Sequence, residues 1–158
     1  MNPGGVRVDL LYPKSGPETE DGVVRYEEIF NVQPFGNSLV TMTLTGAQIE
    51  TMLEQQFLGD DRILQPANVS YSWSQGAVDG DRVDPAGVVI NGAPLDLDGS
   101  YRVTVNSFLS DGGDRFPVLV QGTNKLGGDV DLDAVEKYFA AQSGPVSPPP
   151  LGRITVAP

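Results

Sequence analysis

The 158-residue sequence contains neither cysteine nor histidine. Without cysteine the chain has no disulfide, no thiol nucleophile and no thiolate metal ligand, although this does not fix its compartment. Without histidine it lacks the usual general base at neutral pH, the Ser-His-Asp triad and every histidine-bound metal. A carboxylate site for magnesium or calcium is the remaining alternative, but no suitably spaced Asp/Glu loop is present. We therefore expect no catalytic metal centre in this chain.

Cationic residues are scarce, with 10 Lys and Arg against 21 Asp and Glu and a formal net charge of −11. Nucleic-acid backbones are bound by clustered Lys and Arg, so we expect no nucleic-acid partner. A small phosphorylated ligand remains compatible, since one well-placed Arg can serve it. The simpler interpretation of the acidic excess is solubility, as in an exported protein.

Long apolar runs are also missing, since no stretch approaches the roughly 20 residues that span a bilayer. The N-terminus has no basic segment followed by an apolar one, so no signal peptide is expected within this chain. The sequence opens on a Gly-rich turn, on which a domain rarely starts, so we expect it to be cut from a longer protein. Its length suits one domain, residues 1–158, with an ordinary globular content of 39% hydrophobic and 20% charged residues.

Alternating apolar and polar residues predict several strands. They are expected at Ser38 to Leu44, Val69 to Trp73, Tyr101 to Val105 and Arg153 to Val156, with a strand-like run at Val6 to Leu10. Asn91 and Gly92 suit the positive φ angles of a type I′ turn and predict a hairpin over residues 88–95.

Two amphipathic helices are predicted. Thr45 and Gln48 form a capping box ahead of the first, whose apolar face carries Ile49, Leu53 and Phe57. The second runs from Asp131 to Gln142, and a short helical turn is expected at residues 26–30. Because strands alternate irregularly with few helices, the sequence predicts an α+β fold with a mixed β-sheet.

Two phenylalanines stand in polar, glycine-containing loops. Phe35 lies in the segment from Gln33 to Asn37, and Phe108 lies in the segment from Asn106 to Asp114. Exposed aromatic rings stack well on planar ligands. Local sequence alone favours the alternative that both rings fold back onto the core, because single apolar residues in loops are common.

Four motifs occur in the same order as in the C-terminal domain of the 5′-nucleotidase and UDP-sugar hydrolase family, which this chain resembles. They are Asn2 to Arg7, Gln33 to Asn37, Leu44 to Gly46 and Phe108 to Asp114. The resemblance extends from Asn2 to about Val156. It implies the same α+β fold and a role in binding the nucleoside part of a substrate.

The resemblance also assigns roles to individual residues, and it reverses the local interpretation of both phenylalanines. It implies that Phe35 and Phe108 sandwich the base and that Asp114 bonds the ribose hydroxyls. It places Arg7 on the ribose-phosphate side, and Asn2 and Asn37 near the base. Departures from the family occur at Arg115, where a glycine is common, and at Pro66-Ala67, where a Ser-Gly turn is common.

In this family, a separate N-terminal metallophosphoesterase domain holds two divalent metal ions, such as Zn or Mn, and hydrolyses the phosphate ester. We therefore expect the present chain to bind a nucleotide or nucleoside but to be inactive alone. The implied location is extracellular, at the cell surface or periplasmic. Three alternatives stay open: the same domain of a 2′,3′-cyclic-nucleotide phosphodiesterase with 3′-nucleotidase activity, that of a UDP-sugar hydrolase, and a non-catalytic interaction module.

Overall fold

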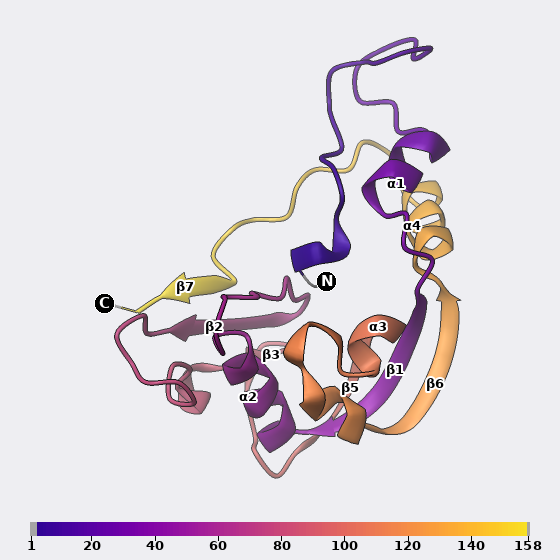
Figure 1. Ribbon diagram of the computed structural model, residues 1–158. Coiled ribbons are helices and arrows are strands. Elements are labelled where there is room, and N and C mark those ends of the chain that lie inside the picture. Colours follow the sequence, from indigo (N-terminus) through magenta and orange to yellow (C-terminus); the bar gives the residue numbers. More distant parts are fainter. Residues whose placement is uncertain (1–2, 158) are drawn as a thin grey trace.

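The computed structural model describes residues 3–157 and confirms the predicted α+β class. Figure 1 shows two small sheets with helices between and beside them. The helices are α1 (Tyr26–Val32), α2 (Gly46–Gln55), α3 (Ser107–Ser110) and α4 (Asp131–Ala140), and the 3-10 turns are η1 (Pro3–Gly5), η2 (Pro85–Gly87), η3 (Gly113–Arg115) and η4 (Pro117–Gln121). The strands are β1 (Ser38–Thr45), β2 (Val69–Trp73), β3 (Val89–Ile90), β4 (Ala93–Pro94), β5 (Ser100–Asn106), β6 (Thr123–Val130) and β7 (Ile154–Val156).

The first sheet has the order β5-β1-β6, and both pairings are antiparallel. β1 follows the predicted alternation, because Met42 and Leu44 are fully buried while their neighbours are only partly covered. In the β1–β5 pair, Leu39 lies opposite Asn106 and Thr45 lies opposite Ser100. The beginning of β1 and the end of β5 therefore meet at the same end of this sheet.

The second sheet has the order β4-β3-β2-β7, with β7 parallel to β2 and the other pairs antiparallel. The predicted hairpin is confirmed: Asn91 (φ 51°) and Gly92 (φ 81°) take the left-handed conformation between β3 and β4. An extended proline-containing segment leads from α4 to β7 (Figure 1).

Helix α2 lies between the sheets and shares one hydrophobic cluster with them. Its predicted capping box is present: the Gln48 amide donates to the Thr45 hydroxyl at 3.1 Å, and the Thr45 amide donates to the Gln48 side chain at 2.9 Å. Ile49, Leu53 and Phe57 are buried as predicted. The cluster also takes in Tyr71, Trp73, Val88, Leu109, Phe116 and Leu119.

One predicted strand is absent from the described structure, and one observed strand has no counterpart among the predictions. Val6 to Leu10 forms no strand in the described structure; Arg7 donates a backbone hydrogen bond to Val32 at 2.8 Å, and the apolar side chains of Val6, Val8 and Leu10 remain exposed. Conversely, β6 was not predicted, because every residue along it is exposed. A strand that buries neither face leaves no period-two pattern in the sequence.

Candidate functional site

The sheet register brings the loops of Phe35 and Phe108 together. Phe35 precedes the start of β1 and Phe108 follows the end of β5, and these two strand ends are paired through Leu39 and Asn106. The Ser107 hydroxyl lies 3.4 Å from the Asn37 side-chain oxygen, where it donates a hydrogen bond. Two loops that lie far apart in the sequence thus meet at one end of the first sheet.

Both phenylalanine side chains are partly exposed, Phe35 by 36% and Phe108 by 46%. The interpretation that they fold back onto the core is therefore wrong. At the second loop the local cause is visible, since Asn106 caps α3 by accepting a bond from the Leu109 amide at 2.9 Å. This short helix turns Leu109 and Ser110 into the core and leaves Phe108 exposed.

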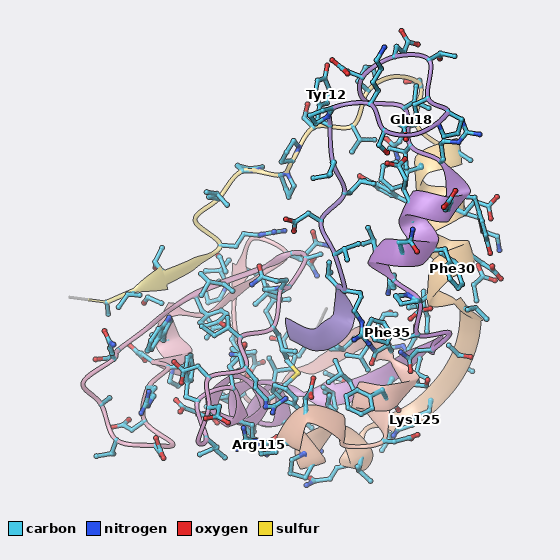
Figure 2. The ribbon with its side chains drawn as sticks, turned by 45° about the horizontal axis from the view of Figure 1, so that its top comes forward. Tyr12, Glu18, Phe30, Phe35, Arg115 and Lys125 are labelled. Atoms are coloured by element: carbon cyan, nitrogen blue, oxygen red, sulfur yellow. The ribbon has the colours of Figure 1, made fainter. Side chains whose placement is uncertain are left out.

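Arg7 lies over the Phe35 ring, with its guanidinium carbon 5.2 Å from the ring centroid. A cation over an aromatic face is attracted by the ring quadrupole. Arg7 therefore covers one face of the Phe35 ring. The Arg7 amide is itself tied to the Val32 carbonyl at 2.8 Å. In Figure 2, Phe35 appears beside η1, the turn that precedes Arg7. The remaining predicted residue, Asn2, lies outside the described residues.

Gly113 packs against the Phe108 ring and directly precedes Asp114 in the chain. A side chain at Gly113 would lie 2.6 Å from the Cε1 and Cζ atoms of Phe108, which is closer than van der Waals contact allows. The ring therefore rests on the glycine backbone. The next residue, Asp114, has a left-handed backbone with φ 52°. The residue that carries the carboxylate thus directly follows the glycine against which Phe108 packs.

Asp114 forms an ion pair with a residue that sequence analysis did not single out. Arg62 Nη1 donates to Asp114 Oδ1 at 2.8 Å, and the Asp114 side chain is only 13% exposed. Arg115, the departure from the family pattern, lies instead beside Asp60, with 3.6 Å between their charged atoms. Arg62 stands in an irregular loop with no periodicity, so local sequence carries no signal for this pairing.

Cations are concentrated around these loops although the protein is strongly acidic. Of the ten Lys and Arg residues, four contact the candidate residues or their close neighbours: Arg7, Arg62, Arg115 and Lys125. Lys125 Nζ donates to the Ser110 carbonyl at 3.0 Å (labelled in Figure 2). Two of these cations face carboxylates, Arg62 beside Asp114 and Arg115 beside Asp60, so the loops carry charges of both signs.

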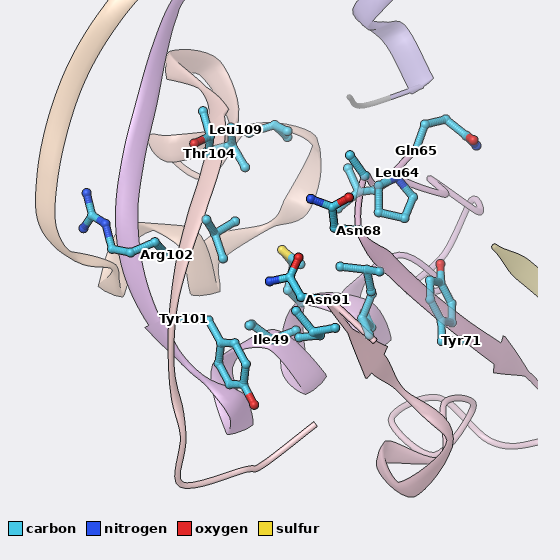
Figure 3. Close-up of a pocket in the computed structure, with 18 of the residues that line it drawn as sticks. Ile49, Leu64, Gln65, Asn68, Tyr71, Asn91, Tyr101, Arg102, Thr104 and Leu109 are labelled. Atoms are coloured by element: carbon cyan, nitrogen blue, oxygen red, sulfur yellow. The ribbon is translucent and has the colours of Figure 1, made fainter. Parts of the chain in front are cut away.

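A cavity of about 500 Å³ lies next to the candidate site, between α2, β5 and the segment from Leu64 to Val69. Figure 3 shows Ile49 and Leu109 on its wall, with Asn68 and Asn91 facing into it. Arg7, Phe35, Phe108 and Asp114 do not line this cavity. Leu109 does, so the cavity adjoins the site without being part of it.

Gln56 and Tyr71, which both line this cavity, are hydrogen-bonded to each other. Gln56 Nε2 lies 3.0 Å from the Tyr71 hydroxyl, and the hydroxyl in turn lies 3.2 Å from Gln56 Oε1. Burial raises the pKa of Tyr71 above its usual value of 10.0, and the hydrogen bond to Gln56 partly offsets this shift. Tyr71 is therefore neutral in its structural role at physiological pH.

Among residues 3–157, no group of three or more His, Cys, Asp or Glu side chains is arranged to hold a metal ion. No helix within the same residues is long and apolar enough to cross a bilayer.

Comparison with known proteins places these features in context. The family described as 5′-nucleotidase, C-terminal domain, matches residues 1–121. The chain is 29% identical to Endonuclease YhcR of Bacillus subtilis, over 99% of this chain and 12% of that protein. It is 32% identical to Cell wall protein Lmo0130 of Listeria monocytogenes, over 89% of this chain and 18% of that protein.

Among solved structures, the 5′-nucleotidase precursor from Thermus thermophilus is 32% identical and superposes with a TM-score of 0.79. The match covers 98% of this chain and 30% of that protein. The chain thus spans less than a third of the length of each of these relatives. It belongs to the 5′-nucleotidase C-terminal domain family.

Proposed function

We propose that this chain is the substrate-specificity domain of a 5′-nucleotidase-like hydrolase and that it binds the nucleoside part of a nucleotide. One observation carries the proposal: Phe35 and Phe108 are both partly exposed and stand on two loops that contact each other. Phe108 packs against Gly113, the residue directly before Asp114. An aromatic pair with a carboxylate beside it suits a flat base joined to a sugar that carries hydroxyl groups.

The physical chemistry of each group supports this role. Stacking a base on an aromatic ring contributes about 1–3 kcal/mol and tolerates different bases. A carboxylate accepts hydrogen bonds from sugar hydroxyls. Arg7, whose guanidinium lies over the Phe35 ring, is a cation that could contact a phosphate group of the ligand. Asn37, whose side chain contacts Ser107, and Asn2 are proposed to face the base.

The chemistry of ester cleavage is proposed to belong to a separate N-terminal metallophosphoesterase domain of the same parent chain. Two divalent metal ions in that domain would supply the nucleophile and stabilise charge on the phosphate. We expect the 158-residue chain alone to release no phosphate. A parent that acts outside the cytoplasm fits the name of the cell wall relative. A role of that parent in nucleotide catabolism is part of the proposal.

Other parent activities fit the same site. A 2′,3′-cyclic-nucleotide phosphodiesterase with 3′-nucleotidase activity or a UDP-sugar hydrolase would present the same nucleoside to the two rings. The Bacillus subtilis relative is named an endonuclease, so similar sequences also occur in proteins that are not named 5′-nucleotidases. Turnover of these substrates by the full-length parent separates the activities.

The two rings are tested by titrating the isolated domain with adenosine and following backbone amide shifts. Trp73 is buried and stacks on Phe57 at 4.6 Å, so its fluorescence is a poor reporter of this site. We expect saturable binding, and we expect Phe35→Ala and Phe108→Ala each to weaken it about tenfold, the equivalent of about 1.4 kcal/mol of lost stacking.

Phe30→Ala is the matched control. Phe30 is also an exposed phenylalanine, at 47%, but it lies on α1 and contacts Tyr26 (Figure 2). We expect the Phe30→Ala variant to bind adenosine with the same affinity as the wild type. Binding that survives both loop substitutions would exclude stacking of the base between Phe35 and Phe108. The absence of saturable nucleoside binding would favour an interaction module.

A further inference from the structure

We infer that Arg62 is a positioning residue, which orients the Asp114 carboxylate for the two adjacent hydroxyl groups of a ribose. The inference deepens the proposed function and rests on it. Arg62 comes from the loop between α2 and β2, which the family motifs do not include. It therefore adds a fourth segment to a site that the sequence assigned to the segments of Arg7, Phe35 and Phe108.

The loop that carries Arg62 is built on the side chain and backbone of Gln56, which is fully buried. The Arg62 amide donates to the Gln56 carbonyl at 2.7 Å, and the Leu64 amide donates to Gln56 Oε1, also at 2.7 Å. Gln56 Nε2 is fixed in turn by the Leu53 carbonyl at 2.8 Å. The backbone on both sides of Arg62 is thus held by one core residue.

From this fixed backbone, Arg62 Nη1 reaches Asp114 Oδ1 at 2.8 Å across 52 residues of sequence. Arg62 Nε is buried and has no hydrogen-bond partner among the described residues. The bond to Asp114 is the side-chain hydrogen bond that the structure describes for Arg62, and it fixes one oxygen of the carboxylate.

Asp114 needs such support because its backbone is unusual. Asp114 and Arg115 both have left-handed φ angles, 52° and 67°. A non-glycine residue holds this conformation only when its surroundings enforce it. A second contact between the same two loops runs in the opposite direction, from Arg115 to Asp60. The two loops are therefore joined by two Arg–Asp pairs.

The chemistry of this arrangement points to a ligand with a cis-diol. A carboxylate that is held in one orientation can accept hydrogen bonds from two neighbouring hydroxyl groups, whereas a freely rotating one loses conformational entropy on binding them. Fixing Asp114 therefore increases the preference for ribose over a sugar that lacks both hydroxyls. It leaves stacking of the base unchanged.

The test compares adenosine with 2′,3′-dideoxyadenosine, both titrated into the domain by NMR. The variants are Arg62→Met, which keeps the apolar stem, and Arg62→Lys, which keeps the charge. We expect the wild type to prefer adenosine and Arg62→Met to lose about tenfold of that preference, which is close to the lower end of the range for a hydrogen bond to a charged group. Affinity for the dideoxynucleoside stays the same, and Arg62→Lys restores part of the preference.

Lys137→Met is the matched control, since Lys137 forms an ion pair of similar length, 2.7 Å to Asp129, on the exposed surface. It removes one cation without touching the site, and we expect it to keep the wild-type preference. An unchanged preference in Arg62→Met overturns the inference. So does an equal loss of affinity for both nucleosides, because that result indicates a structural role alone.

A wild type that binds neither nucleoside contradicts the proposed function instead. The positioning role is then decided by ¹⁵N relaxation of the Gly113, Asp114 and Arg115 amides. Greater fast motion at these amides in Arg62→Met than in Lys137→Met supports the role of Arg62, and equal motion in the two variants overturns it.

Discussion

Among single residues, Gln56 links several segments of the core through one buried side chain. Its amide is fully buried and contacts three different segments: the end of α2, the Arg62 loop and Tyr71 in β2. A buried amide with such partners is costly to remove, because each partner loses its bond without gaining water. Gln56 therefore couples the stability of the core to the position of Arg62.

We expect Gln56→Leu to lower the free energy of unfolding by about 2–3 kcal/mol, since it leaves the Leu64 amide and the Tyr71 hydroxyl unpaired. Urea denaturation followed by circular dichroism measures the change. Gln142→Leu is the control, because Gln142 is exposed and bonds only the Tyr138 carbonyl among the interactions described for its side chain. Equal stabilities of the two variants would contradict the role assigned to Gln56.

At the candidate site, single residues differ in how far the sequence reveals them. Some stand in motifs whose order along the sequence resembles that of a known family, so the sequence alone points to them: Phe35, Phe108 and Asp114. Arg62 contributes through a contact 52 positions away, and no local pattern precedes or follows it. Only the folded chain shows that it faces Asp114.

Among the elements, the start of α2 is the most tightly constrained. The Gly46 amide donates to the Gly99 carbonyl at 3.0 Å, and the Ala47 amide donates to the Leu97 carbonyl at 2.9 Å. These bonds satisfy amides at the first turn, which have no partner within a helix. The 96–99 turn thus packs directly against the beginning of the helix.

A side chain at Gly46 would coincide with the backbone carbonyl of Asp96. Alanine normally stabilises a helix by about 1 kcal/mol relative to glycine. Here we expect the opposite sign, with Gly46→Ala lowering the free energy of unfolding by about 1–3 kcal/mol because the turn must move. Thermal and urea denaturation measure the difference.

Gly76→Ala is the control for this substitution, because no atom lies within 4 Å of the added carbon and its φ is not positive. We expect it to change stability by less than about 0.5 kcal/mol. If Gly46→Ala proves as stable as Gly76→Ala, the packing of the turn against α2 is looser than the structure indicates.

For the molecule as a whole, the C-terminal segment completes the second sheet. β7 pairs in parallel with β2, the Tyr71 amide donates to the Arg153 carbonyl at 2.9 Å, and Ile154 packs against the core cluster. The chain therefore closes its fold by returning from α4, beside the first sheet, to the far sheet (Figure 1).

We expect a chain that ends at Gln142 to lose about 2–4 kcal/mol of stability, from lost apolar burial and hydrogen bonds at β2. The bared edge of β2 should also promote association. Urea denaturation and analytical ultracentrifugation test both effects. Replacing residues 145–150 with glycine and serine keeps β7, and we expect a smaller loss from it; equal losses would mean that the tether matters more than the strand.

The sequence by itself determined the elements that bury one face and the order of the motifs. β1, β2, β5 and α2 were predicted because burial on one side imposes a period of two or 3.6 residues, and the absence of histidine limited the chemistry of the chain. The tertiary structure decided the pairing of Arg62 with Asp114, the exposure of Phe35 and Phe108, and the existence of β6. These depend on contacts between distant segments or on a strand with no buried face, and neither leaves a local pattern in the sequence.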